Sequence, residues 1–161
     1  MKSFTSTILL LAGLTTANPI TQSQPRQTTP SPYQISTFYA SRTHNSYSCN
    51  YEFTLTSSTL PTPITCSARG LDSGFTGSPW LASVYPGTGN CNDTRVTWEF
   101  YQPKRFDGET PADFYVTIDG VKGKYVIPKE DFTLTPNGPS PFDDDFYYSG
   151  PQEFEVVDFD F

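Results

Sequence analysis

The sequence predicts an all-β protein, a single-domain antiparallel β-barrel or β-sandwich of about seven to nine short strands. Aromatic residues make up 16% of the chain, with 13 Phe, 10 Tyr and 2 Trp, and aromatic side chains favour strands. The 15 Pro and 11 Gly interrupt the chain often, as turns between short strands do. No window repeats apolar residues at the three- and four-residue spacing that an amphipathic helix requires.

Alternation of apolar and polar side chains locates the individual strands. The clearest case is residues 94–101, where Val96, Trp98 and Phe100 fall on one face and polar residues on the other. We therefore expect Trp98 in the core. By the same criterion we expect strands at residues 33–40, 46–56, 64–69, 80–85, 94–101, 114–118, 121–127, 132–135 and 154–157.

Turn-forming residues separate these strands. Asp119-Gly120 stands between two alternating segments and predicts a two-residue hairpin turn. Residues 86–90, Pro-Gly-Thr-Gly-Asn, predict another turn. Residues 69–79 and 136–148 contain the longer loops, which are the candidates for recognition because loops on a rigid scaffold often carry function.

The N-terminal residues predict a secretion signal. Lys2 gives a short positive region, residues 8–14 are apolar, and residues 15–17 are small, which predicts cleavage after Ala17. The apolar run is about half of the ~20 residues that span a bilayer. We therefore expect a secreted, extracellular protein with no membrane partner.

The rest of the chain divides by composition. Residues 18–32 are rich in Pro, Gln and Thr and lack periodicity, so we expect a disordered leader. Residues 33–158 hold all the expected strands and form the β domain. Residues 159–161 are an acidic tail.

Charge excludes one class of partner. The chain carries a formal net charge of −7. Residues 18–105 contain six basic and four acidic residues, whereas residues 106–161 contain thirteen acidic residues and three lysines. Such a chain has no basic surface for nucleic acid. The simplest explanation of the negative net charge is that it keeps the protein soluble.

Catalytic signatures are absent from the sequence. The single histidine, His44, lies in a polar loop, and no nucleophile elbow, zinc pair or phosphate loop occurs. Asp143-Asp144-Asp145 could supply oxygen ligands to calcium, but without an alternating ligand pattern a solvated loop is favoured. We therefore expect no enzyme activity, no catalytic or metal residues and no cofactor.

Three positions are candidates for modification or binding. Asn92-Asp93-Thr94 is an N-glycosylation sequon beside a predicted strand, which makes Asn92 a surface candidate. Lys104-Arg105 is either an exposed basic turn or a dibasic cleavage site, and the turn is favoured. Trp80 follows Gly77-Ser78-Pro79 and is either a core residue or a ligand contact.

The cysteine count is odd. Cys49, Cys66 and Cys91 cannot all pair within one chain, although secreted proteins usually pair their thiols. The count alone does not say which cysteine remains.

Five motifs in order carry a family resemblance. They are Cys49-Asn50-Tyr51-Glu52-Phe53, Thr65-Cys66-Ser67-Ala68, Cys91-Asn92-Asp93 followed by Val96-Thr97-Trp98-Glu99-Phe100, Ile127-Pro128-Lys129-Glu130-Asp131-Phe132, and Tyr148-Ser149-Gly150-Pro151-Gln152-Glu153-Phe154. Over residues 33–157 the chain resembles the small secreted fungal proteins with an Alternaria alternata allergen 1-like domain. Some members are described as elicitors of a hypersensitive response. The resemblance implies an extracellular β-barrel or β-sandwich and brings no catalytic residues.

The resemblance also bears on the cysteines. Relatives of this type often have a cysteine after an Ala-Ser-like pair, where Arg42 stands here. The contexts Thr-Cys-Ser-Ala and Cys-x-Asp then favour a Cys66–Cys91 disulfide, expected to contribute about 2–4 kcal/mol. Cys49 is left as the third thiol, so we expect a monomer or a Cys49-linked dimer.

These observations lead to one preferred function and two alternatives. The preferred function is non-enzymatic extracellular recognition of an unknown host protein or glycan, as an effector or elicitor. The first alternative is a small-ligand- or carbohydrate-binding barrel, which needs an apolar cavity or an exposed aromatic strip. The second is a hydrolase of unrecognised type.

Overall fold

A computed structural model describes residues 33–42, 46, 48–71, 81–103, 110–139 and 143–158. The expected signal, leader and acidic tail lie outside the described residues. His44, Trp80 and Lys104-Arg105 also lie outside them, so their predicted roles stay predictions.

The described residues form an all-β structure, which confirms the predicted fold class. Every strand pair in it is antiparallel. The elements are β1 (Tyr33–Arg42), β2 (Ser48–Thr56), β3 (Ile64–Leu71), β4 (Asn90–Cys91), β5 (Val96–Tyr101), β6 (Ala112–Ile118), β7 (Val121–Ile127), the 3₁₀ turn η1 (Lys129–Asp131), β8 (Phe132–Thr135), β9 (Asp145–Tyr148) and β10 (Phe154–Asp158).

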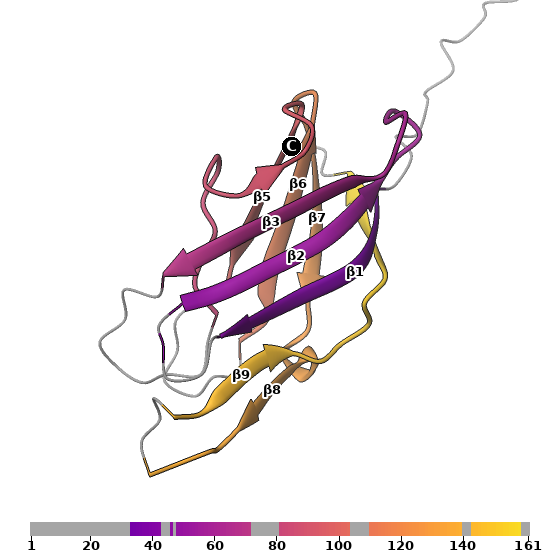
Figure 1. The fold of residues 1–161 in the computed structure, drawn as a ribbon. Helices are drawn as coiled ribbons and strands as arrows, with labels where there is room; N and C mark the ends of the chain where they lie inside the picture. The colour runs from indigo at the N-terminus through magenta and orange to yellow at the C-terminus, as the bar shows by residue number, and fades with distance from the viewer. Residues whose placement is uncertain are drawn as a thin grey trace, which may run out of the picture.

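The strands make one nearly closed, barrel-like sheet in the order β4-β3-β2-β1-β10-β7-β6-β5. β9 pairs with the far end of β1, and β8 pairs with β9. In Figure 1 the β1–β3 layer crosses obliquely in front of β5–β7, and β8 and β9 extend it at its lower edge. The side chains between the two layers form the core.

A β-bulge in β1 determines which of its side chains enter the core. The register with β2 shifts between Ser36 and Tyr39, and Thr37 has a φ of 54°. A bulge adds one residue to a strand and so reverses the faces of the residues that follow. As a result Phe38 is buried and Tyr39 faces solvent.

The core is built from aromatic rings, as the composition predicts. Phe38 stands at its centre, with ring centroids 5.3 Å from Phe114, 4.9 Å from Tyr148 and 5.3 Å from Phe154. Trp98 is 1% exposed and packs edge-on against Phe53 at 5.1 Å. The predicted core position of Trp98 is therefore confirmed. Edge-to-face contacts of this kind are the favoured geometry for aromatic pairs.

The hairpin between β6 and β7 agrees with the sequence. Asp119 and Gly120 have φ values of 50° and 85°. Two successive positive φ angles define the type I′ turn, whose twist matches that of the strands it joins.

Two strands were not predicted and one predicted strand is wrong. Asn90, expected in a turn, begins the two-residue β4, and β9 lies inside the expected 136–148 loop. β4 is too short to show alternation, and β9 begins inside the run of aspartates at residues 143–145. In the described part of segment 80–85 only Val84 makes a ladder contact, with Phe100. The Gln102 side chain holds that segment instead, since its Oε1 accepts the Leu81 N–H at 3.0 Å.

Candidate functional site

Cys66 and Cys91 form a disulfide that joins β3 to β4. The two residues are direct cross-strand partners, and Cys66 is fully buried. This is the pairing that the family resemblance implied. Because β4 has only two residues, the disulfide adds a covalent bond to its short pairing with β3.

Cys49 lies in the core rather than at the surface. Its side chain is 0% exposed, and its Sγ accepts a hydrogen bond from the Ala82 N–H at 3.2 Å. Its cross-strand partner on β1 is Arg42, whose guanidinium donates to the Asp144 carbonyl. A Cys49-linked dimer would therefore require the β1–β2 end of the sheet to open.

Asn92 is exposed directly after β4. Its Oδ1 accepts the Thr65 N–H and its own N–H donates to the Thr65 carbonyl, both at 3.1 Å. The amide nitrogen that a glycan would join takes no part in these two bonds. In the same turn, the side-chain hydrogen bond from Arg95 holds the pKa of the next residue, Asp93, below its usual value.

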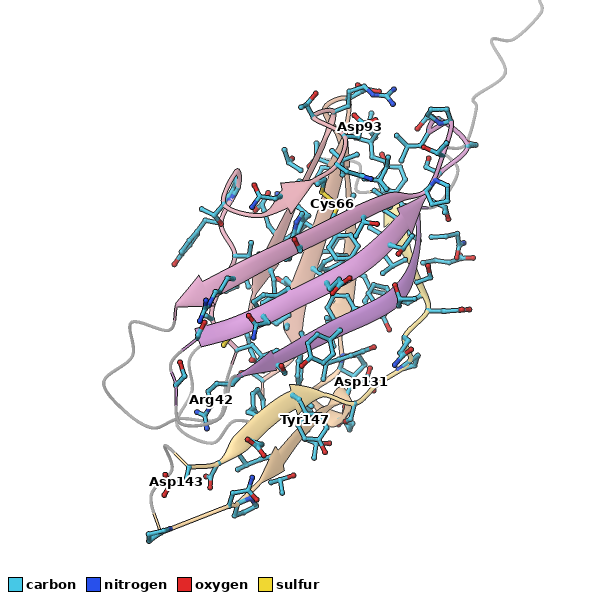
Figure 2. The ribbon with its side chains drawn as sticks, viewed as in Figure 1. Arg42, Cys66, Asp93, Asp131, Asp143 and Tyr147 are labelled. Carbon is cyan, nitrogen blue, oxygen red and sulfur yellow. A yellow bond between two sulfur atoms is a disulfide. The ribbon has the colours of Figure 1, made fainter. Side chains whose placement is uncertain are left out.

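The acidic triplet at residues 143–145 is tied to its own neighbours. The Asn137 side-chain amide donates to Asp145 Oδ2, and the Asp143 side chain packs against Gly138. Figure 2 places Asp143 at the lower end of the molecule, below Arg42. Among the described residues no group of three His, Cys, Asp or Glu side chains could hold a metal ion.

A polar surface with two exposed tyrosines covers the outer side of β3, β2, β1, β9 and β8. We call it the Tyr39 face. Cross-strand pairing places one residue from each strand in a row, and a second row lies beside it. The first row is Arg69, Asn50, Ser41, Tyr147 and Thr133, and the second is Ser67, Glu52 and Tyr39.

The two tyrosines of the Tyr39 face stand on neighbouring strands. Tyr39 is 51% exposed and Tyr147 36%. Figure 2 shows Tyr147 on β9, next to the β1 strand that carries Tyr39. Ser41 pairs directly with Tyr147, so Tyr39, two residues before Ser41, is its diagonal neighbour. Diagonal neighbours are about 7–8 Å apart, within reach of long side chains.

The opposite layer has a different outer surface, which we call the Tyr115 face. Lys122 Nζ sits 4.3 Å from the centre of the Tyr115 ring, and Lys124 Nζ 5.3 Å from it. The same lysines pair with Glu99 at 2.7 Å and Asp113 at 2.9 Å. The Tyr115 ring is therefore covered by charges that already have partners.

A third group of titratable residues lies near η1. Burial raises the pKa of the Asp131 carboxyl, and Glu130 adds to the shift. Burial also raises the pKa of Tyr148, whose hydroxyl donates to the Pro151 carbonyl at 2.6 Å. Ser149 N donates to the Asp131 carbonyl at 2.7 Å, which fixes β9 against η1.

No family model, curated protein or solved structure matches this chain. The likeness to the allergen 1-like family therefore rests on the sequence motifs alone. Within the described residues no helix has the length and apolar character to cross a membrane.

Sequence reasoning did not find Tyr39 or Tyr147. Strict alternation from Tyr33 places Tyr39 inward, and only the bulge turns it outward. Tyr147 lay in a segment predicted as a loop. The tyrosines at these positions look like core residues in a chain so rich in aromatics, and no local pattern marks them as exposed.

Proposed function

We propose that this protein is a non-enzymatic, secreted recognition protein that acts outside the cell, as an effector or elicitor on a host plant. The observation that carries the proposal is the Tyr39 face, where two exposed tyrosines stand among polar side chains. Rigid aromatic side chains with polar neighbours are typical of recognition surfaces.

The scaffold beneath this surface supports binding with little rearrangement. Phe38 and Phe53 lie directly behind the outer strands and are 1% and 0% exposed. A packed interior resists deformation, so the positions of Tyr39 and Tyr147 are set before a partner arrives. Preorganisation of this kind lowers the entropy lost on association.

Both segments expected to carry recognition contribute to the Tyr39 face. Arg69 begins the 69–79 segment, and Tyr147 belongs to the 136–148 segment. The proposed surface is therefore a sheet face to which a described residue of each segment belongs, rather than a pair of separate loops.

Extracellular location is part of the proposal. The Cys66–Cys91 disulfide supports it, because such bonds persist in oxidising compartments. The signal-like residues 1–17 and the resemblance to secreted fungal proteins agree with it.

The ion pairs made by two carboxylates, Asp93 and Glu99, favour recognition over catalysis. In the described residues Asp93 is paired with Arg95 at 2.7 Å, and Glu99 with Lys122 at 2.7 Å. A glycoside hydrolase would instead oppose two carboxylates across its substrate.

The test is a response assay in plant tissue. Purified secreted protein is infiltrated into leaves at micromolar concentration, and cell death, oxidative burst and retention in the leaf are measured. Protein that has been reduced and heat-denatured is the control. A response or retention specific to the folded protein supports the proposal, and the absence of both overturns it.

A further inference from the structure

We propose that the Tyr39 face binds a neutral polysaccharide, with Tyr39 and Tyr147 stacking against the sugar rings. This inference rests on the proposed recognition function and names the class of ligand. It follows from the orientation of Tyr39, the neighbouring side chains, the local charge and a contrast with the Tyr115 face.

The Tyr39 ring lies along the sheet rather than pointing away from it. Its hydroxyl is 2.6 Å from the hydroxyl of Ser41, two residues further along the same strand. A hydrogen bond of that span directs the ring parallel to β1, and the side chain is still 51% exposed. Tyr39 therefore presents a flat aromatic surface to solvent.

Such a surface suits a sugar ring. The face of an aromatic ring is negative, so it attracts the weakly positive C–H groups on the flat side of a pyranose. Tyr147, the diagonal neighbour on β9, offers a second aromatic contact about 7–8 Å away. Two adjacent units of one polysaccharide chain can then be held at once.

Polar groups stand where sugar hydroxyls would lie. The row that contains Tyr147 also carries the Ser41 hydroxyl, the Asn50 amide and the Arg69 guanidinium. Arg69 is anchored by a 2.7 Å bond from its Nε to Ser48 Oγ. Four strand spacings make this row about 19 Å long, which gives an extended chain several hydrogen-bonding partners.

The local charge favours an uncharged ligand. The two rows of the Tyr39 face contain one cation, Arg69, and one carboxylate, Glu52, so their charges cancel. The chain as a whole carries −7, which repels polyanions at longer range. A neutral polysaccharide meets no such repulsion and requires no unpaired charge to be buried.

The Tyr115 face lacks these properties although it is also rich in tyrosine. The Tyr115 hydroxyl likewise bonds within its own strand, to Asp113 at 3.2 Å. However, Lys122 and Lys124 occupy the space over its ring. The same layer carries Tyr101, which is 50% exposed and so matches Tyr39 in exposure. Tyr101 therefore supplies a control.

The experiment is a binding assay with the full chain. Secreted protein is incubated with insoluble cellulose, chitin and β-1,3-glucan as neutral probes, and with immobilised polygalacturonate as an anionic probe. Tyr39→Ala and Tyr147→Ala are compared with Tyr101→Ala, and thermal unfolding confirms that each variant is folded. Tyr39→Phe keeps the ring but loses the bond to Ser41 that orients it, so we expect it to bind more weakly than the wild type and more tightly than Tyr39→Ala.

Binding to at least one neutral probe, about tenfold weaker in Tyr39→Ala and Tyr147→Ala, supports the proposal if Tyr101→Ala binds as the wild type does and Tyr39→Phe binds more tightly than Tyr39→Ala. Three results overturn it: no binding to any neutral probe, binding to polygalacturonate alone, or equal binding by all variants. Self-association through the Tyr39 face, seen by sedimentation without polysaccharide binding, also overturns it. If leaves still respond to folded protein after such a result, only the ligand class is wrong and the recognition function stands.

Discussion

Arg42 faces Cys49 directly across the antiparallel pair of β1 and β2, and both side chains are buried. In the family that the sequence resembles, a cysteine is often found at the position of Arg42. The register provides a physical reason for that alternative, because direct cross-strand neighbours lie within the range that a disulfide spans.

We therefore predict that Arg42→Cys forms a second disulfide with Cys49. Closing so short a loop should raise the free energy of unfolding by about 2 kcal/mol, less what is lost with the bond from Arg42 to Asp144. Intact mass and thiol titration on the oxidised protein report the bond. Arg42→Ala measures the loss of arginine alone, and a variant that retains two titratable thiols when unfolded contradicts the prediction.

Removing the existing disulfide should change the free energy of unfolding by more. Cys66 and Cys91 are 25 residues apart, and the loop they close corresponds to about 3 kcal/mol of unfolding free energy. We expect the Cys66→Ala/Cys91→Ala protein to lose that amount and to exchange the β4 amides faster. Urea unfolding and hydrogen exchange measure the two effects, with Cys49→Ala as the comparison. Unchanged β4 exchange would contradict the role assigned to the bond.

Local sequence signals predict some elements of this fold and not others. The alternation of Val96, Trp98 and Phe100 located β5 correctly, and Asp119-Gly120 located the hairpin between β6 and β7, because both signals are local. The exposure of Tyr39 is not local, since it depends on the extra residue that the bulge inserts near Thr37. A one-residue shift reverses every later side chain, so sequence alternation could not predict the Tyr39 face.

The sequence did not predict β9, for a different reason. Its four residues begin with the last aspartate of the 143–145 run, and although β8 is near in the chain, its other partner, Ser41 on β1, lies far away. Short strands owe their stability to such pairing rather than to intrinsic propensity. Tyr147 could be recognised as exposed only once that pairing was known.

Asn92 is predicted to carry a glycan when the protein is secreted from a eukaryotic host. The residue is exposed, and its Oδ1 bond to Thr65 orients the side chain without using the amide nitrogen. Digestion with peptide N-glycosidase should lower the intact mass. Thr94→Ala removes the sequon but keeps the Thr65 bond, so it should abolish the glycan and leave stability unchanged. An unshifted mass in the wild-type protein contradicts the prediction.

Asp131 is predicted to make stability decrease as pH rises. Burial, with a smaller effect of Glu130, raises the pKa of its carboxyl above the usual 3.8. Between that value and the raised pKa, the folded protein binds more protons than the unfolded chain, so the unfolding free energy falls with pH. Below the window this contribution to stability is fully present, and above the window it is lost.

Asp131→Asn should therefore raise the melting temperature at about pH 7 and change it little at about pH 3. Its backbone bond from Ser149 is retained in the variant. Glu153→Gln, at an exposed carboxylate, is the matched control. A melting temperature that shifts equally at both pH values would show that the effect does not come from ionisation.

Thr37 is predicted to be a strained residue that the bulge requires. Its φ of 54° is in the left-handed region, where a β-branched side chain is unfavourable and glycine is not. Thr37→Gly should raise the unfolding free energy by up to about 1 kcal/mol, reduced by loss of the 3.1 Å contact with the Thr54 hydroxyl. The neighbouring Ser36→Gly, in extended strand, should instead lower it by about 0.5–1 kcal/mol. Chemical denaturation of the two variants decides the matter, because opposite signs at adjacent positions are expected only if the bulge holds Thr37 under strain. If Thr37→Gly destabilises the protein as much as Ser36→Gly does, Thr37 is not strained. Pairing with β2 and β9 alone then accounts for the outward position of Tyr39.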